Sequence, residues 1–232
     1  AKVSVTELKR RFSVQSQEED IFIPGFLTPS IKKPLFLEEK KGLTSSQKGT
    51  IIHFVMQSLD FSVLRTITVH SDIGTQNKLD YSSVIEKHIN NMVSKDLLSK
   101  TQADNVDISM INGLLNSQLG IRMLKADKLN REIPFNMQIP VEEIIKDKKE
   151  DNLQGETVLL QGVIDCYFED NSELILVDYK TDNVSDGKED IILKRYKLQM
   201  DYYKRALENI TSKKVKERFI YLFRSGKTLE II

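Results

Sequence analysis

Apolar residues recur every three or four positions in the first half of the chain and alternate with polar residues in much of the second half. The first spacing predicts helices and the second predicts strands, because their faces repeat about every 3.6 and every 2 residues. Ser4 and Glu7 have the spacing of a helix capping box. Helices are expected at residues 4–11, 48–61, 82–98, 108–124 and 188–210, and strands at residues 131–139, 157–168, 174–180 and 218–224.

The order of these elements predicts the fold class. Helices come first, three strands follow, and a long helix separates them from a last strand. The polar link of residues 169–173 has the length of a hairpin loop, so the strands on either side of it are expected to pair antiparallel. We therefore expect an α/β or α+β domain, with a central mixed sheet flanked by helices and with an N-terminal helical part.

Periodicity is lost between Gln15 and Gly49, where three of the five prolines lie, and this loss predicts an extended connector. Residues 142–154 are charged and are expected to be exposed. The chain begins with Ala1 rather than Met, so we expect a piece of a longer protein or a processed product. The expected parts are an N-terminal helix and connector over residues 1–47 and a main domain over residues 48–232, divided into a helical part, 48–130, and a core, 131–232.

The composition is that of a globular protein. Of the 232 residues, 40% are apolar and 29% are charged, which permits a sizeable core and excludes a disordered or fibrous chain. No apolar run approaches the roughly 20 residues that span a bilayer, and there is no signal-peptide pattern, so no membrane partner is expected. The 34 basic and 34 acidic residues cancel, so any contact with nucleic acid must come from local patches.

Cys166 is the single cysteine of the chain. One cysteine excludes an internal disulfide framework, a four-cysteine zinc site and a four-cysteine iron–sulfur cluster. We therefore expect a reducing, intracellular setting and no iron–sulfur cofactor.

Two acids and a lysine stand out in the predicted strands. Asp165 interrupts an apolar strand, and Asp178 and Lys180 end another on the same face, with Tyr179 opposite, because strand side chains alternate. Two carboxylates from neighbouring strands can hold a divalent cation such as Mg²⁺. A lysine beside them can orient or help deprotonate a water, or neutralise a phosphate. On spacing alone, an ordinary Asp–Lys pair that ends a strand is the more common explanation.

The ordered motifs resemble those of the restriction-endonuclease-like nucleases. Asp165 followed by Asp178-Tyr179-Lys180 is similar to their Asp…(Asp/Glu)-x-Lys core, and GVIDCYFE, LVDYKTD and SVTELK resemble the RecB-family nuclease domain, especially the AddA type found in bacterial helicase-nucleases. The resemblance covers nearly the whole chain. It implies the restriction-endonuclease-like fold and a Mg²⁺-dependent DNA exonuclease, in which Mn²⁺ can substitute. Relatives with an iron–sulfur cluster carry four cysteines, so Cys166 alone favours the A-type subunit.

The resemblance also implies individual roles. Lys180 would position or activate the attacking water, and Gln199 and Tyr203, at i and i+4 of one helix, match a Gln-x-x-x-Tyr motif that positions the lysine and the strand. Glu132 stands on the strand where the family often has a glutamate. The implied metal ligands are His53, Asp165, Asp178 and the Tyr179 carbonyl.

Without the resemblance, several of these residues have plainer explanations. His53 lies on an apolar stripe and would more often be a core histidine, and Gln199 and Tyr203 could simply pack a helix. His70 and His88 lack any motif and are expected to be structural or exposed.

Basic residues gather around the Gln199 helix. Residues 188–218 hold ten basic and five acidic side chains, so a local positive face could meet a phosphodiester substrate beside an acidic metal pocket. A solvated helix face is the alternative. The basic residues on and around the helix are Lys194, Arg195, Lys197, Lys204 and Arg205, whereas Lys213, Lys214 and Lys216 suit a loop.

Residues 225–228, SGKT, do not form a nucleotide-binding loop. That motif requires a glycine five positions before Gly226, where Tyr221 stands, so we expect a turn between two apolar segments. No ATPase motor is present, and the resemblance places the helicase motor upstream of Ala1.

The resemblance implies a bacterial, cytoplasmic complex that processes double-strand breaks for recombinational repair. The nuclease of its A-type chain would cut single-stranded DNA emerging from the motor, and the B-type chain of the same heterodimer would be its partner. Two alternatives remain: a non-catalytic DNA-binding or scaffolding domain of the same fold, and a stand-alone nuclease of phage or defence type. The intact acids and lysine argue against the first, and the missing initiator Met and long connector argue against the second.

Overall fold

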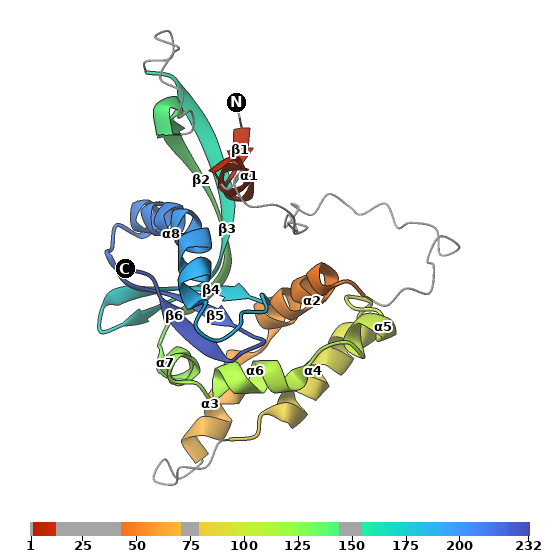
Figure 1. Ribbon diagram of the computed structural model, residues 1–232. Helices are drawn as coiled ribbons and strands as arrows, with labels where there is room; N and C mark the ends of the chain where they lie inside the picture. The colour runs from red at the N-terminus through yellow and green to blue at the C-terminus, as the bar shows by residue number, and fades with distance from the viewer. Residues whose placement is uncertain (1, 13–42, 71–78, 144–154) are drawn as a thin grey trace. The chain divides into compact units, whose positions relative to one another are not determined.

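The computed structural model describes residues 2–12, 43–70, 79–143 and 155–232 (Figure 1). They belong to two compact units. The sheet unit comprises Ala1–Gln17 and Ser117–Ile232, and the helical unit comprises Glu18–Asn116. The predicted division at residue 47 stays a prediction.

The sheet unit is built on a six-stranded mixed sheet, which confirms the expected fold class. Strands follow one another in the order β1-β3-β4-β5-β6, and β2 pairs with β3. Two pairs are parallel, β1 with β3 and β4 with β5, and the other three are antiparallel. The strands are β1 Lys2–Ser4, β2 Leu129–Pro140, β3 Thr157–Asp170, β4 Glu173–Lys180, β5 Val215–Leu222 and β6 Lys227–Glu230.

The predicted hairpin between β3 and β4 is present. Asn171 and Ser172 form its turn, both with positive φ, 51° and 67°, as a type I′ hairpin turn requires. The predicted turn near residue 226 also forms, because the Gly226 N–H donates to the Leu222 carbonyl at 2.8 Å before β6 begins. The strand predicted at 218–224 therefore runs from Val215 to Leu222, and β1 and β6 were not predicted.

Helix α8, Glu189–Thr211, makes the crossover between the parallel strands β4 and β5 (Figure 1). Its apolar stripe joins the core of the sheet unit, which also takes in buried side chains of β2, β3, β4 and β5. Ser212 ends α8 in the left-handed conformation, with φ 56°. The buried residues of α8 are Ile192, Tyr196, Met200, Tyr202, Tyr203, Ala206 and Leu207.

Two short helices complete the sheet unit. Helix α1, Val5–Phe12, begins where Ser4 Oγ accepts the Glu7 N–H at 3.1 Å, so the predicted N-terminal cap is confirmed. Helix α7 is Gln118–Lys125, and its N-cap Ser117 accepts the Gly120 N–H at 3.0 Å. The helix predicted over 108–124 is therefore wrong as one element, because Asn116 ends one helix and Ser117 caps the next.

The helical unit packs its helices around residues such as Val55, Leu64, Ile85 and Ile111. A Thr44–Gln47 capping box starts the first of them three residues earlier than predicted. The second was not predicted, and the third ends before residue 98. The helices are α2 Ser45–Ser58, α3 Phe61–His70, α4 Ser82–Ser94, α5 Lys100–Ala103 and α6 Ile108–Leu115.

Two predicted segments fall largely outside the described residues. These are the connector, of which only residues 43–49 are described, and the charged segment, of which only Glu142 and Glu143 are described and exposed. In the described part of the chain, no helix combines the length and apolar character needed to cross a bilayer.

Candidate active site

The strands β3 and β4 part where the two predicted acids lie. Their backbone pairing runs from Asp170↔Glu173 to Cys166↔Val177 and goes no further. In the same register Asp165 would come next opposite Asp178. Instead, Asp165 Oδ2 accepts the backbone N–H of Tyr179 at 2.8 Å, so a side chain takes the place of a ladder bond. We call this junction of Asp165 and Asp178 the fork.

Asp178 is fully buried at the fork and is bound from two sides. Its Oδ1 accepts a hydrogen bond from Gln199 Nε2 of α8 at 2.9 Å, and its Oδ2 pairs with the Lys180 ammonium. The prediction that Asp178 and Lys180 share a face is therefore confirmed. Burial lowers the pKa of Lys180, but the charges of Asp178 and Asp165 outweigh it and raise that pKa, so the amine is a cation at neutral pH.

Tyr203 lies one helical turn beyond Gln199 and is buried. Burial, followed by the charges of Asp178 and Asp165, holds its pKa well above the usual range, and a hydrogen bond with Gln199 opposes them. Gln199 thus links the tyrosine to the buried acid. The Gln-x-x-x-Tyr pair predicted from the sequence reaches the fork from α8.

A glycine permits this placement of Tyr203. The ring of Phe135 in β2 meets Tyr203 edge-on, with centroids 5.7 Å apart, and lies over Gly162, its cross-strand partner in β3. A Cβ at Gly162 would lie 2.7 Å from two ring carbons of Phe135. The absence of a side chain at residue 162 therefore lets an aromatic layer form behind the fork.

Glu132 brings a third carboxylate to the fork. It has φ 51°, a conformation that non-glycine residues seldom adopt, and the pairs Arg131↔Cys166 and Ile133↔Ile164 place it across from Asp165. Carboxylate oxygens of Glu132 and Asp165 lie within 4.8 Å of each other. Two like charges at this separation repel, and a cation between them would remove the repulsion.

This donor set fits a divalent metal ion. Mg²⁺ prefers carboxylate and carbonyl oxygens, and Glu132, Asp165 and Asp178 present carboxylates from three strands at one point of the sheet. The half-buried positions of Glu132 and Asp165 keep them accessible to an ion.

Comparison with known proteins identifies the family. A family model described as PD-(D/E)XK nuclease superfamily matches residues 31–229. The chain belongs to this superfamily.

The most similar curated relatives are longer proteins, each named as the A-type chain of an ATP-dependent helicase/nuclease. The relative from Acetivibrio thermocellus is 50% identical over 229 residues, that from Ruminiclostridium cellulolyticum 44% over 231, and that from a Thermoanaerobacter strain 42% over 230. These matches cover 99%, 100% and 99% of this chain. The chain spans only 17% of the length of each relative.

In this PD-(D/E)XK domain, the middle residue of the Asp-Tyr-Lys motif is a core residue by its side chain. The ring of Tyr179 is buried beside that of Phe223, with centroids 5.6 Å apart, on the face away from Lys180. Burial also raises the pKa of the neighbouring Cys166 thiol to about 12. Of Tyr179, the backbone carbonyl is therefore the part that stays a predicted metal ligand.

The predicted histidines lie in the helical unit. His53 is half-buried on α2, and its role as a metal ligand of the PD-(D/E)XK site stays a prediction. Nε2 of His88 lies 3.0 Å from Ser58 Oγ, so it ties α4 to α2, as expected of a structural histidine.

Several of the predicted DNA-facing cations are bound within the protein. Arg195 pairs with Asp182 at 3.0 Å and Arg205 with Glu143 at 2.6 Å, while Lys197 donates to the Ile232 carbonyl at 2.5 Å. Lys194 and Lys204 have no such partner within the described ranges. The lysines expected in a loop pair with surface acids: Lys213 with Glu169, Lys214 with Glu208 and Lys216 with Glu173.

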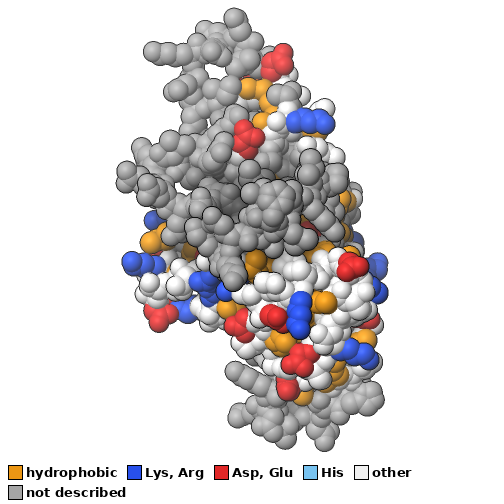
Figure 2. Space-filling view, turned by 90° about the vertical axis from the view of Figure 1, so that its right-hand side faces the viewer, with side chains coloured by type: hydrophobic (Ala, Val, Ile, Leu, Met, Phe, Trp, Pro, Cys, Tyr) orange, Lys and Arg blue, Asp and Glu red, His pale blue; other side chains and the backbone are white. Residues whose placement is uncertain are grey.

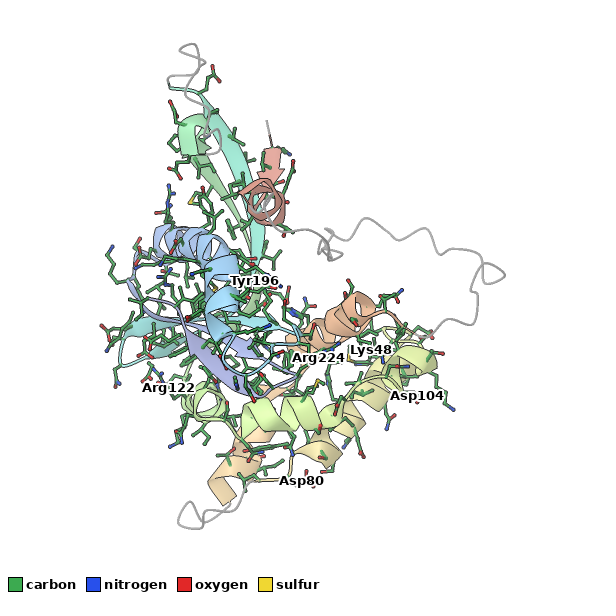
Figure 3. All side chains as sticks on the ribbon, in the orientation of Figure 1. Lys48, Asp80, Asp104, Arg122, Tyr196 and Arg224 are labelled. Carbon is green, nitrogen blue, oxygen red and sulfur yellow. The ribbon has the colours of Figure 1, made fainter. Side chains whose placement is uncertain are left out.

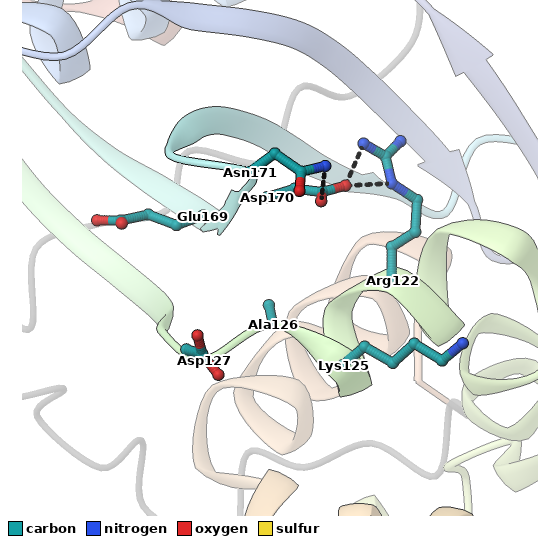
Figure 4. A pocket seen from close by; sticks show the side chains of 7 residues that line it. All are labelled: Arg122, Lys125, Ala126, Asp127, Glu169, Asp170 and Asn171. Carbon is teal, nitrogen blue, oxygen red and sulfur yellow. Dashed lines mark hydrogen bonds and ion pairs between the residues drawn. The ribbon is translucent and has the colours of Figure 1, made fainter.

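Charges of both signs are interspersed on the face seen in Figure 2. The five acids and cations that line a shallow pocket near the β3–β4 turn belong to a different part of the sheet unit from the fork (Figure 4). The pocket residues are Arg122, Lys125, Ala126, Asp127, Glu169, Asp170 and Asn171.

Sequence analysis missed two residues beside the fork. Tyr196 lies three residues before Gln199 and seven before Tyr203, so the helical repeat already puts all three on neighbouring positions of α8. Asp182 follows Lys180 by two residues and accepts a hydrogen bond from the Tyr196 hydroxyl at 2.8 Å. The helical spacing from Gln199 could have signalled Tyr196, whereas nothing in the sequence signalled Asp182.

Proposed function

We propose that this domain is a Mg²⁺-dependent deoxyribonuclease that cuts single-stranded DNA as an exonuclease. The observation that carries the proposal is the convergence of Asp165, Asp178 and Lys180 at the fork, with the Glu132 carboxylate beside them. Membership of the PD-(D/E)XK superfamily supports the same chemistry.

The acids of the fork are the proposed metal ligands. Asp165 and Asp178 would hold Mg²⁺, or Mn²⁺ in its place, with Glu132 close enough to contribute a further carboxylate. His53 and the Tyr179 carbonyl are the remaining ligands that the resemblance implies. When bound, the ion supplies Lewis-acid stabilisation of charge on the phosphate and on the leaving oxygen.

Lys180 is the proposed catalytic cation. Its protonated amine, held beside Asp178, can donate hydrogen bonds to an attacking water or to a phosphate oxygen. Gln199 fixes one oxygen of Asp178 and so keeps the carboxylate from rotating away from Lys180. Tyr203, buried behind Gln199, keeps the amide in place.

Helix α8 is the proposed path of the DNA backbone. Lys194 is exposed and Lys204 half-exposed on this helix, and neither is bound by an acid of the described residues, so both can meet phosphates. A single strand can follow such a basic helix without base-specific contacts.

The relatives suggest a larger setting. Their printed names describe A-type chains of helicase/nucleases, and this chain matches 17% of their length. We propose that it serves as the nuclease domain of such a chain, with a helicase motor in the same protein and the B-type chain of the heterodimer as partner. The complex would process double-strand breaks in the bacterial cytoplasm.

Cleavage of end-labelled single-stranded DNA tests the proposal. The full-length gene product containing this chain would be assayed with Mg²⁺, Mn²⁺ or EDTA, beside Lys180→Ala and the surface control Lys213→Ala. We expect metal-dependent cutting by the wild type and the control and none by Lys180→Ala. Absence of cutting with every metal, in a protein that still binds DNA, would instead support a non-catalytic binding domain.

A further inference from the structure

The Lys180 ammonium has a second neighbour besides Asp178. Its Nζ lies 4.8 Å from the ring centroid of Tyr196, within the range of a cation–π interaction. Tyr196 is 6% exposed and the Lys180 side chain 15%, so the contact is largely shielded from water. Figure 3 shows Tyr196 on α8 where the helix lies over the sheet.

The ring of Tyr196 is itself anchored. Its hydroxyl donates to Asp182 Oδ2 at 2.8 Å, and Asp182 Oδ1 accepts a hydrogen bond from Arg195 at 3.0 Å. Burial, then the charge of Asp182, raises the pKa of Tyr196, so the hydroxyl keeps its proton and remains a donor. A flexible lysine thus rests on an aromatic ring that is fixed at its far end.

A neutral ring differs from a carboxylate as a partner for this lysine. A cation held by Asp178 competes with Lys180 for the same oxygens, because both are attracted to the same charge. The ring face attracts the ammonium without offering a ligand to a metal ion of the fork. It can therefore hold the lysine whether or not Asp178 is engaged.

We propose that Tyr196 is a positioning residue that keeps Lys180 directed to the fork through its ring, with Asp182 as the anchor of that ring. The catalytic consequence rests on the proposed nuclease function, whereas the positioning itself does not. Tyr202 provides a matched control, because it is equally buried on α8 but faces Glu143 and Arg205 instead.

The first experiment measures positioning in the absence of metal. The full-length protein in EDTA would be labelled with an amine-specific reagent, and the modification rate of Lys180 would be followed by mass spectrometry. We expect Tyr196→Leu to raise that rate about fivefold or more, and Tyr196→Phe and Tyr202→Leu to leave it near the wild-type value. An unchanged rate in Tyr196→Leu would overturn the proposal.

The second experiment measures the catalytic consequence. We expect kcat to fall about tenfold in Tyr196→Leu with KM unchanged, and to recover in Tyr196→Phe, which keeps the ring. Equal losses in Tyr196→Leu and Tyr202→Leu would show a merely structural role. If Tyr196→Leu does not fold, pentafluorophenylalanine at residue 196 keeps the shape and removes the negative ring face, and kcat must still fall.

The two experiments separate the two proposals. A changed labelling rate with no cleavage by the wild type under any metal overturns the nuclease function and keeps the positioning. Wild-type cleavage that is lost in Lys180→Ala but unaffected by the ring overturns the positioning and keeps the nuclease.

Discussion

Strands β3 and β4 carry a charged cluster at each end, and the two clusters are built on opposite plans. At the hairpin end, Arg122 of α7 donates to Asp170 at 3.0 and 2.8 Å and to Glu217 at 2.7 and 3.1 Å. Its guanidinium also lies within 6 Å of the rings of Phe168 and Phe219. At the fork, the carboxylates of Glu132, Asp165 and Asp178 gather around Lys180.

The difference separates a structural cluster from a binding site. The hairpin cluster matches each acid to two donors of one planar cation, an arrangement that needs no ligand (Figure 4). The fork places two carboxylates within 4.8 Å of each other, one of them on a strained residue, Glu132. Acids held together against their repulsion indicate a site that awaits a cation.

Asp178→Asn gives the largest expected effect and tests the fork directly. The amide keeps the shape but removes the charge that faces Lys180, so cleavage should fall at least about a thousandfold. The matched change at the other end, Asp170→Asn, should leave the cleavage rate within about twofold. A fully active Asp178→Asn variant would remove the distinction between the two clusters.

Gly162→Ala sharpens the account of how the fork is supported. The new methyl group would lie 2.7 Å from the Phe135 ring, which cannot move without shifting Tyr203. We expect the free energy of unfolding to fall by about 2 kcal/mol, as is usual for overpacking, with a several-fold loss of cleavage. Chemical denaturation measures the first effect; wild-type stability would show that the ring has free space.

Arg122→Met should weaken the hairpin cluster without touching the fork. The side chains concerned are 23–33% exposed, so screening keeps the expected loss to about 1–2 kcal/mol of unfolding free energy. Thermal unfolding and the cleavage assay would be run on the same preparation. Loss of cleavage at unchanged stability would mean that the hairpin end takes part in function.

Glu132→Gln should act in the opposite sense on stability. In EDTA it removes like-charge repulsion, so the unfolding free energy should rise by about 0.5 kcal/mol, while the affinity for Mn²⁺ measured by calorimetry should fall. Asp170→Asn, by contrast, should lower stability and leave Mn²⁺ binding alone. A lower stability of Glu132→Gln in EDTA would show that Glu132 is already balanced within the protein.

Lys194→Ala is expected to have the smallest effect. Loss of one exposed phosphate contact should weaken binding of single-stranded DNA about two- to fivefold and reduce its salt dependence. Lys216→Ala, whose lysine pairs with Glu173 at 2.5 Å, is the control. Equal effects of the two changes would argue against a DNA path along α8.

The sequence could predict the fork only in part. Strand alternation was enough to put Asp178 and Lys180 on one face, because a side chain's direction in a strand depends on position alone. The approach of Glu132 to Asp165 depends on a left-handed backbone at a non-glycine residue, which no local pattern indicates. Asp182 escaped notice because its contact with Tyr196 joins a loop to a helix 14 residues later.

The fold showed the same division between local and distant causes. Helices with regular apolar stripes were predicted, and the break at Asn116–Ser117 was missed because two caps in succession interrupt a stripe that continues across them. Strand β1 was missed because three residues carry no period, and only the distant partner β3 makes them a strand.

That pairing has a consequence for how the chain folds during synthesis. Lys2 pairs with Leu159, so the first strand waits for more than half of the chain before it meets its neighbour. The helical unit, Glu18–Asn116, is complete on the growing chain well before β3 emerges from the ribosome. Closing such a long loop makes the sheet unit the slow step of folding, and the polypeptide can assemble its acidic fork only after its helices are already in place.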